Sequence, residues 1–372
     1  MICRNSVLRK QDLIALRLTS KSHGIHLSAS LEFAERHFKE IPLVYTRYSL
    51  ETFVEICKHS TFGSAVREIQ LSYARFLPEC FQEESKSLFD DIHGEMESQD
   101  RLKYLDKIQL LVNRCDAEED LEKTGDARDL LAAAFSALSL WNHSLELSVS
   151  SKEDRTLGSN RLYISEDPGA RWRCDVLGTV ALLCRAATLS GCLVQYLRIH
   201  GTVWDHLVDS SAYSLSVLSH LPELELEVWS PDHDNLAPIS SLEDMFTKLL
   251  NHTVGLKILH LDCYYFERYD RCLDKVFSAM TIPGLQKLIL SNVDFDLCNP
   301  FQKRIETLHQ LELYDCRPRG SLKKALLSVQ NNFPRLKNFY LSDFLGHEVE
   351  LEGAQGINDR LNELIHSEAG PS

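Results

Sequence analysis

The sequence predicts an α/β fold in which parallel strands alternate with helices, and three observations carry this prediction. The pattern Leu-x-x-Leu-x-Leu occurs four times in the C-terminal third of the chain, at 256–261, 285–290, 308–313 and 336–341, with phenylalanine as the second apolar residue of the last copy. The copies start 29, 23 and 28 residues apart, a spacing at which one strand and one helical segment stack on the next pair. Segments with helical periodicity, such as 272–280 and 322–329, lie between the copies.

The spacing within each copy also predicts which side chains point outward. The last two apolar residues of a copy are two apart, so on an extended strand both point to the same side, into the core. The residue between them, and the one two positions further on, then lie on the opposite face. The sequence therefore predicts a partner-binding surface made of His260, Asp262, Ile289, Ser291, Glu312, Tyr314, Tyr340 and Ser342.

Looser copies of the pattern occur upstream, at 66–71, 145–147, 194–199 and 221–226. Taken singly, each is equally consistent with an ordinary strand, but together they predict about eight strands in one array. Repeats of this kind are the signature of leucine-rich repeats. We therefore expect a leucine-rich-repeat-like solenoid at 46–350, preceded by a small helical segment at 1–45, interrupted by an acidic helical insertion at about 79–126 and followed by a tail at 351–372.

The composition of the 372 residues excludes several classes of protein. The formal net charge of −14 disfavours binding to nucleic acid or to anionic lipid, which both require clustered lysine and arginine. The eleven cysteines are dispersed without paired spacing, which indicates reduced thiols. Cys184, Cys263 and Cys316 are expected to be small buried apolar residues. No apolar stretch has the length of a membrane span or a signal peptide, so we expect a cytoplasmic or nuclear protein.

Patterns typical of enzymes and metal sites are not found in the sequence. It has no phosphate-binding glycine loop, no nucleophile elbow and no zinc-protease helix. Asp232, His233 and Asp234 are adjacent in a loop and would point in different directions, which disfavours a metal site. The acidic residues at 118–122 are interpreted as a solvated helix face. We therefore expect no catalytic residues, no metal and no cofactor.

The N-terminal region carries a resemblance to a known family. Residues 12–21 form an amphipathic pattern with Asp12, Leu13, Leu16, Arg17, Leu18 and Lys21, and the Ile41-Pro42-Leu43 step, the 49–71 segment and the repeats follow it. This arrangement resembles the fungal F-box proteins, in which a Leu-Pro-x-Glu-Leu helix precedes a helix of the type Asp-Leu-x-x-Leu-Arg-Leu-x-x-Lys. Only the second of these helices is present, which suggests that Met1 is an internal methionine of a longer reading frame.

The resemblance implies a non-enzymatic adaptor with two binding ends. One end would contact a Skp-type adaptor of a cullin-RING ubiquitin ligase through Leu13, Leu16, Arg17, Leu18 and Lys21. The repeats, at the other end, would present a protein substrate. Two alternatives stay open on the sequence alone. Residues 12–21 could instead cap the exposed end of the repeat array, and the chain could be a leucine-rich-repeat scaffold without any connection to a ligase.

Overall fold

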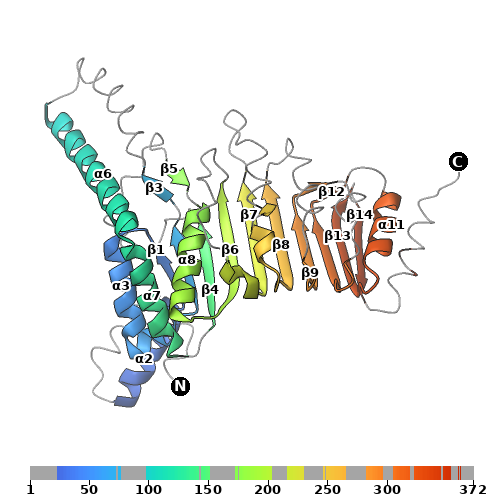
Figure 1. Ribbon diagram of the computed structural model, residues 1–372, viewed down its shortest axis with the longest axis horizontal. Helices are drawn as coiled ribbons and strands as arrows, with labels where there is room; N and C mark the ends of the chain where they lie inside the picture. Colours follow the sequence, from blue (N-terminus) through green and yellow to red (C-terminus); the bar gives the residue numbers. More distant parts are fainter. Residues whose placement is uncertain are drawn as a thin grey trace. The chain divides into compact units, whose positions relative to one another are not determined.

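The computed structural model describes residues 23–72, 74–76, 98–141, 144–150, 172–174, 176–202, 216–229, 246–247, 249–264, 282–295, 305–318, 322–344, 347–352, 359 and 361. The chain forms two compact units, residues 1–194 and 195–372. In both units the principal strands are parallel, and helices alternate with them (Figure 1). The predicted α/β class is therefore confirmed.

The first unit is a small parallel sheet covered by helices. Strand β2 pairs with β1 on one side and with β4 on the other, both in parallel. Its described elements are α2 (His23–His37), β1 (Glu40–Leu43), α3 (Arg47–Lys58), α4 (Ser60–Gly63), β2 (Glu68–Ser72), β3 (Ala74–Phe76), α6 (Ser98–Thr124), α7 (Asp126–Ser139), β4 (Leu145–Ser150), β5 (Trp172–Cys174) and α8 (Val176–Ser190). Strands β3 and β5 form a separate antiparallel pair.

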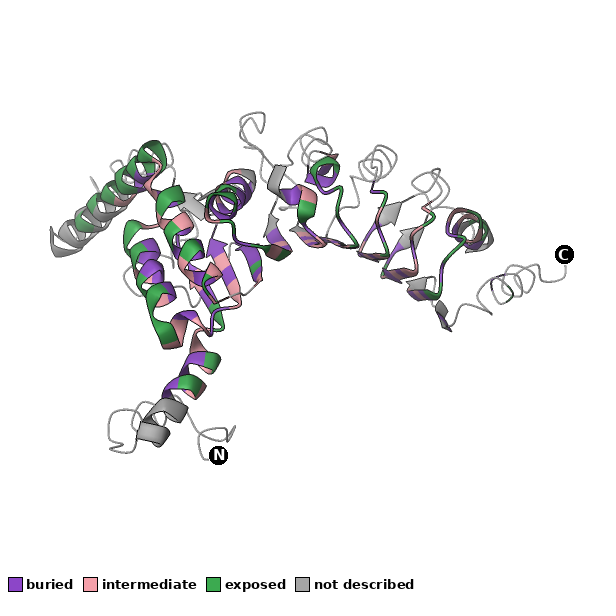
Figure 2. Cartoon of the chain, turned by 60° about the horizontal axis from the view of Figure 1, so that its bottom comes forward, coloured by how far each residue is buried: buried purple, intermediate pink, exposed green. Residues whose placement is uncertain are grey.

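Helices α3, α7 and α8 bury one side each and expose the other (Figure 2). The buried side chains of α7 include Leu131, Ala134, Phe135 and Leu138, which follow the three- and four-residue spacing of one helix face. Helix α3 is capped by Thr46, whose side chain accepts a hydrogen bond from the Ser49 amide at 3.2 Å. Ser49 is fully buried.

Strand β1 was not predicted from the sequence, and the solvent exposure predicted for one acidic residue of α6 was wrong. The Ile41-Pro42-Leu43 step forms a strand that pairs with β2, although the segment is short and contains proline. Glu118 was expected in a solvated face, but it is buried and accepts a hydrogen bond from Arg114 Nε at 2.9 Å. The ion pair with Arg114, within the same helix, therefore replaces water as the partner of the Glu118 carboxylate.

The second unit is a sheet of parallel strands in continuous register. Neighbouring strands pair in the order β6, β7, β8, β9, β11 and β13 (Figure 1). Its described elements are β6 (Val194–Thr202), η4 (Ser216–His220), β7 (Glu223–Trp229), β8 (Ile258–Tyr264), β9 (Lys287–Ser291), β10 (Asp294–Phe295), β11 (Gln310–Tyr314), β12 (Arg317–Pro318), α11 (Leu322–Asn332), β13 (Asn338–Phe344) and β14 (His347–Glu352). The looser upstream copies are also strands, in β2, β4, β6 and β7.

The same turn precedes each of the regular strands of the second unit. The first leucine of each copy donates its amide to the carbonyl three residues earlier, as from Leu256 to Thr253 at 3.0 Å and from Leu336 to Phe333 at 3.2 Å. The next amide bonds to the neighbouring copy, as from Lys257 to Pro222 at 2.8 Å. Equivalent bonds recur before β9 and β11, so copies of one local structure stack in register.

The residues that directly follow β9 and β11 occupy equivalent positions and have the same backbone conformation. Asn292 and Asp315 both have positive φ, 54° and 49°, which asparagine and aspartate tolerate better than most residues. Each is followed by a buried side chain, Val293 or Cys316. The chain then continues into β10 and β12, which pair with each other in parallel.

The end of the sheet differs from the polar tail expected after residue 350. Strand β14 runs antiparallel to β13, with Leu351 opposite Phe339, and Leu351 is buried. The segments 12–21, 232–234 and 272–280 lie outside the described residues, as does the part of the 79–126 insertion that precedes α6, residues 79–97. In the part of the chain that is described, no helix is long and apolar enough to cross a membrane.

Candidate functional site

The strands of the second unit present three rows of side chains on the face opposite the leucine core. Along each strand, buried leucines such as Leu288 and Leu290 alternate with partly exposed residues. The strand register aligns these outward residues into rows that run across the sheet, and two of them, His200 and Ser291, are buried. We call this surface the outer face. Its first row is Tyr196, Glu223, Ile258, Lys287, Gln310 and Asn338; its second is Arg198, Glu225, His260, Ile289, Glu312 and Tyr340; its third is His200, Glu227, Asp262, Ser291, Tyr314 and Ser342.

The structure places all eight residues of the predicted surface on the outer face. His260, Ile289, Glu312 and Tyr340 belong to the second row, and the other four belong to the third. Ser291 is buried, with 8% of its surface exposed, whereas the other seven are partly exposed. The five residues predicted to contact a ligase adaptor, between 13 and 21, lie outside the described residues.

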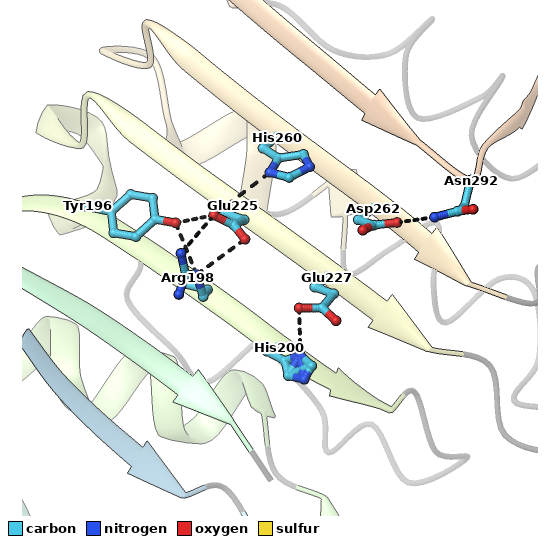
Figure 3. Close-up of polar contacts among 8 residues, drawn as sticks. All are labelled: Tyr196, Arg198, His200, Glu225, Glu227, His260, Asp262 and Asn292. Carbon is cyan, nitrogen blue, oxygen red and sulfur yellow. Dashed lines mark hydrogen bonds and ion pairs between the residues drawn. The ribbon is translucent and has the colours of Figure 1, made fainter. Parts of the chain in front are cut away.

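Glu225 is the centre of a polar cluster that joins three strands (Figure 3). Its carboxylate accepts a hydrogen bond from the Tyr196 hydroxyl of β6. Arg198 of the same strand donates to Glu225 Oε2 from Nη2 at 3.3 Å, and its Nε lies 3.2 Å from Oε1. From the other side, His260 Nδ1 of β8 lies 3.8 Å from Oε2. A single carboxylate thus holds side chains of β6 and β8 over β7.

This arrangement fixes the charge of the cluster. Burial acts to raise the pKa of Glu225, but the hydrogen bonds from His260 and Tyr196 and the charge of Arg198 outweigh it, so the pKa falls to about 2. Burial and the bond to Glu225 raise the pKa of Tyr196 above its usual value, so its hydroxyl stays protonated and donates. The cluster therefore contains one carboxylate and one guanidinium at neutral pH.

Two further contacts link the third row across the strands. His200 Nδ1 of β6 lies 2.8 Å from Glu227 Oε2 of β7. Asn292 donates from Nδ2 to Asp262 Oδ1 of β8 at 2.8 Å, and its own amide bonds to the Tyr314 carbonyl at 2.9 Å. Figure 3 shows the Asn292 side chain beside Asp262. Asn292, which has a positive φ, therefore connects β9 to both β8 and β11.

A second cluster surrounds Glu312 on β11. Lys287 Nζ lies 3.0 Å from Glu312 Oε1, and the Gln310 amide also donates to that oxygen. The Tyr314 hydroxyl donates to Oε2 at 3.1 Å. The Tyr314 ring lies beside that of Tyr340, with centroids 5.0 Å apart and planes inclined by 42°. This half of the outer face therefore combines a paired carboxylate with an aromatic surface.

Of the residues around Glu225, sequence reasoning selected His260 alone. The others belong to the looser upstream copies, for which the sequence predicted strands but not which residues point outward. These residues are Tyr196, Arg198, His200, Glu225 and Glu227. A signal was available, because residues 223–227 alternate glutamate with leucine, the pattern of a strand with one polar face. The cross-strand contacts are not visible in the sequence, since the Tyr196–Glu225 contact joins residues 29 apart.

The chemistry available on the outer face is that of polar recognition. Its carboxylates, cations, hydroxyls and rings are positioned to form ion pairs, hydrogen bonds and aromatic contacts. Within the described ranges, no group of three or more histidine, cysteine, aspartate or glutamate side chains is arranged to hold a metal ion. No protein-family model and no curated protein matches this sequence.

Proposed function

We propose that this protein is a non-enzymatic interaction adaptor that binds another protein on the outer face of its second unit. The observation that carries the proposal is the register of β6 to β13, which aligns three rows of outward side chains, most of them partly exposed, over one continuous surface. The rows combine carboxylates, cations and the Tyr314–Tyr340 pair. Tyrosine and arginine are the residues that most often dominate the energy of protein interfaces.

We further propose that the second unit is leucine-rich-repeat-like. The repeated turn before each strand and the equivalent Asn292 and Asp315 conformations support this. In a repeat protein each copy contacts mainly its neighbours, and the stacked strands create an extended binding surface. Such a frame accepts many different outward residues without a change in fold, so the partner is determined by the residues of the outer face.

The role that the N-terminal resemblance suggests is substrate recognition for a cullin-RING ubiquitin ligase, in the cytoplasm or nucleus. In this proposal Leu13, Leu16 and Leu18 make the apolar contacts with a Skp-type adaptor, while Arg17 and Lys21 lie at the edge of that contact. The outer face then binds the substrate. The alternative is a scaffold that binds a partner through the same face and contacts no ligase.

A pull-down with the Skp-type adaptor separates these two functions. It uses the present chain and a version extended at the N-terminus by the translated upstream reading frame. The ligase proposal expects the extended version to bind the adaptor, and substitution of Leu13 and Leu16 by Asp to abolish that binding. If neither version binds, the chain is a scaffold without a ligase.

A separate experiment tests the outer face. The full chain is used to capture partners from a cell lysate, and the wild type is compared with the double variant Tyr314→Ala/Tyr340→Ala. We expect at least about a tenfold loss of any specifically captured partner, because buried aromatic anchors contribute about 2 kcal/mol or more to an interface. Tyr48→Ala is the control, since Tyr48 is an exposed tyrosine of α3 in the first unit. Equal capture by all three proteins would show that the interface lies elsewhere.

A further inference from the structure

The second unit has a row of hydrogen-bond donors at the edge where the chain enters strands β8, β9, β11 and β13. In each of these copies, the residue after the first leucine donates its backbone amide to the equivalent position of the preceding copy at 2.8 Å, as from Gln286 to the Lys257 carbonyl and from Lys337 to the His309 carbonyl. Stacked copies therefore align these residues one strand apart. Lys257, Gln286 and Lys337 are exposed, and His309 is partly exposed. We call these four residues, Lys257, Gln286, His309 and Lys337, the entry row.

The charge at this edge is opposite in sign to that of the whole chain, whose formal net charge is −14. The stretches that open the four strands are residues 253–258, 282–287, 305–310 and 333–338. They contain one carboxylate, Glu306, and four lysine or arginine residues, Lys257, Lys287, Arg335 and Lys337. Because parallel strands in register begin at the same edge of a sheet, these stretches lie side by side. The edge therefore has a local excess of positive charge.

Three of these four cations are exposed without a neutralising partner among the described residues. Lys287 is paired with Glu312 at 3.0 Å, whereas Lys257, Arg335 and Lys337 form no ion pair within the described part of the chain. Three strand spacings separate Lys257 from Lys337, roughly 14 Å at about 4.8 Å each. This distance is comparable to the Debye length of about 10 Å at 0.1 M salt, so their positive potentials overlap along the entry row. An anionic segment that lies on the row relieves the repulsion among these charges.

The remaining two members of the entry row are also donors. The Gln286 amide and the His309 imidazole lie between Lys257 and Lys337 in the order of the strands. An extended chain of about four residues spans the roughly 14 Å of the row. Its carbonyl groups can accept hydrogen bonds from Gln286 and His309, and acidic side chains at its two ends reach the lysines. Towards β7 the basic edge ends, because the first residue of that strand is Glu223.

We propose that the entry row, together with Arg335, binds an extended segment of a partner protein that bears aspartate or glutamate. This inference rests on the proposed function, because it names the class of partner that the second unit binds. Charge complementarity carries it, since three exposed cations, unpaired among the described residues, lie along one edge of an acidic chain. The guanidinium of Arg335 can hold a carboxylate through two hydrogen bonds. Lys287 connects the entry row to the outer face, because it follows Gln286 directly and lies in the first row.

The test uses the full chain and a fluorescent peptide of about ten residues that alternates glutamate with threonine. Binding is measured by fluorescence anisotropy at roughly 50 and 200 mM salt, because screening weakens surface ion pairs over this range. The net charge of −14 repels this peptide from the chain as a whole. Binding at the lower salt concentration therefore requires a local basic site.

Two variants that lose the same three positive charges are compared with the wild type. The row variant is Lys257→Gln/Arg335→Gln/Lys337→Gln. The control variant, at exposed positions of the first unit, is Lys39→Gln/Lys58→Gln/Lys123→Gln. We expect the row variant to bind the glutamate peptide at least about tenfold more weakly than the wild type at roughly 50 mM salt, and the control variant to differ from the wild type by less than about twofold. The loss in the row variant should shrink at roughly 200 mM salt.

Two results would overturn the proposal. The first is a wild type that shows no binding of the glutamate peptide at the lower salt concentration. The second is an equal loss in both variants, which would mean that binding follows the total charge of the chain. If the row variant does not fold, as judged by its thermal transition, Lys337→Gln alone is compared with Lys123→Gln. The proposal then expects Lys337→Gln to bind at least about threefold more weakly than Lys123→Gln, and equal binding by the two would overturn it.

The proposed function fails or stands on different evidence. A wild type that does not bind the glutamate peptide, yet loses a captured partner on Tyr314→Ala/Tyr340→Ala substitution, keeps the interaction role and refutes the acidic partner. A wild type that binds the peptide through the entry row, while its N-terminally extended version does not bind the Skp-type adaptor, supports the acidic partner and refutes the ligase role.

Discussion

Gly255 and Gly284 hold equivalent places in neighbouring copies, each one residue before the first leucine of its pattern. Their surroundings differ. A Cβ built on Gly255 would lie 2.5 Å from the Ser219 carbonyl oxygen, whereas on Gly284 the nearest atom, the Leu256 carbonyl oxygen, would be 3.6 Å away. The Gly255 amide also donates to that Ser219 oxygen at 3.0 Å. The close approach of the two backbones at Gly255 therefore requires a residue without a side chain.

We predict that Gly255→Ala lowers the free energy of unfolding by about 1–3 kcal/mol, the usual cost of an added methyl group that forces a backbone shift. Gly284→Ala should be neutral or raise that free energy by up to about 1 kcal/mol, because alanine reduces the entropy of the unfolded chain. Urea unfolding of the two variants measures both values. Equal effects at the two positions would contradict the close contact at Ser219.

The low pKa of Glu225 gives the second unit a pH-dependent stability. Its pKa is 4.5 in an unfolded chain and about 2 in the folded protein, so the folded state binds this proton less readily. The resulting stabilisation is complete above about pH 4.5 and is lost as the pH falls towards 2. The physical source is the set of donors, Tyr196, Arg198 and His260, that hold the ionised carboxylate.

We therefore predict that Glu225→Gln lowers the free energy of unfolding at pH 7 by about 1–3 kcal/mol, the range for hydrogen bonds to a charged group. The difference between wild type and variant should shrink as the pH falls below about 4.5. Chemical unfolding curves at several pH values measure it. Glu223→Gln, on the same face of β7, is the control and should change the stability little at pH 7. A constant difference from pH 7 to 3 would contradict the charged network.

At the scale of one strand, the alternation of buried and outward residues determines which side chains enter the core of the sheet. In β9 the side chain of Leu288 is fully buried, while its neighbour Ile289 is partly exposed in the second row. Both residues are apolar, so their type alone does not distinguish them. The turn at Leu285 sets the register, because it fixes which residue of the strand first enters the core.

We predict that Leu288→Ala costs about 2–5 kcal/mol of unfolding free energy, as for other fully buried leucines. Ile289→Ala should cost about 1 kcal/mol or less, since its side chain is already partly in water. Both values come from denaturant midpoints with an unchanged slope. A larger loss for Ile289→Ala would mean that the strand faces the other way.

The elements that sequence reasoning predicted are those whose own residues carry a periodic pattern. The strands β8, β9, β11 and β13 each contain two apolar residues two apart after a fixed turn, so the prediction did not need distant contacts. Strand β1 was missed because it is short and contains Pro42. Proline is tolerated there because β1 is an edge strand, paired with β2 alone among the described strands. Strand β14 was missed because its antiparallel pairing with β13 departs from the repeat.

Outward residues of the outer face were predicted on β8, β9, β11 and β13 but not on β6 and β7. The four downstream copies placed Glu312 and Tyr314 correctly on that face. The paired charges around Glu225 depend on which strands are neighbours and in which register, and neither is specified within a single looser copy. Likewise, the burial of Glu118 results from the packing of α6, which the acidic run around it obscures. A prediction from the charge pattern alone therefore places such a residue in solvent, even where helix packing buries it in an ion pair.

Across the whole chain, the described thiols belong to the two cores. The described cysteines that form no disulfide and are buried are Cys57, Cys115, Cys184, Cys192, Cys263 and Cys316. Burial raises the pKa of Cys184 to about 12 and also raises that of Cys57. Alkylating reagents attack the thiolate, so both burial and protonation protect these side chains in the folded protein. Each thiol becomes reactive only when its own unit opens.

We predict that alkylation at about pH 8, followed by peptide mass spectrometry, leaves Cys57 and Cys184 of the first unit unmodified in the native protein. The same holds for Cys263 and Cys316 of the second unit. As denaturant is raised, the two cysteines of one unit should become reactive at the same concentration, because each unit is compact around a shared core. Cys263 and Cys316 lie two copies apart, so labelling at clearly different concentrations would show that the copies of the second unit open separately. Such behaviour would contradict cooperative unfolding within that unit, since strands β8, β9 and β11 share their core leucines and a continuous ladder of backbone hydrogen bonds.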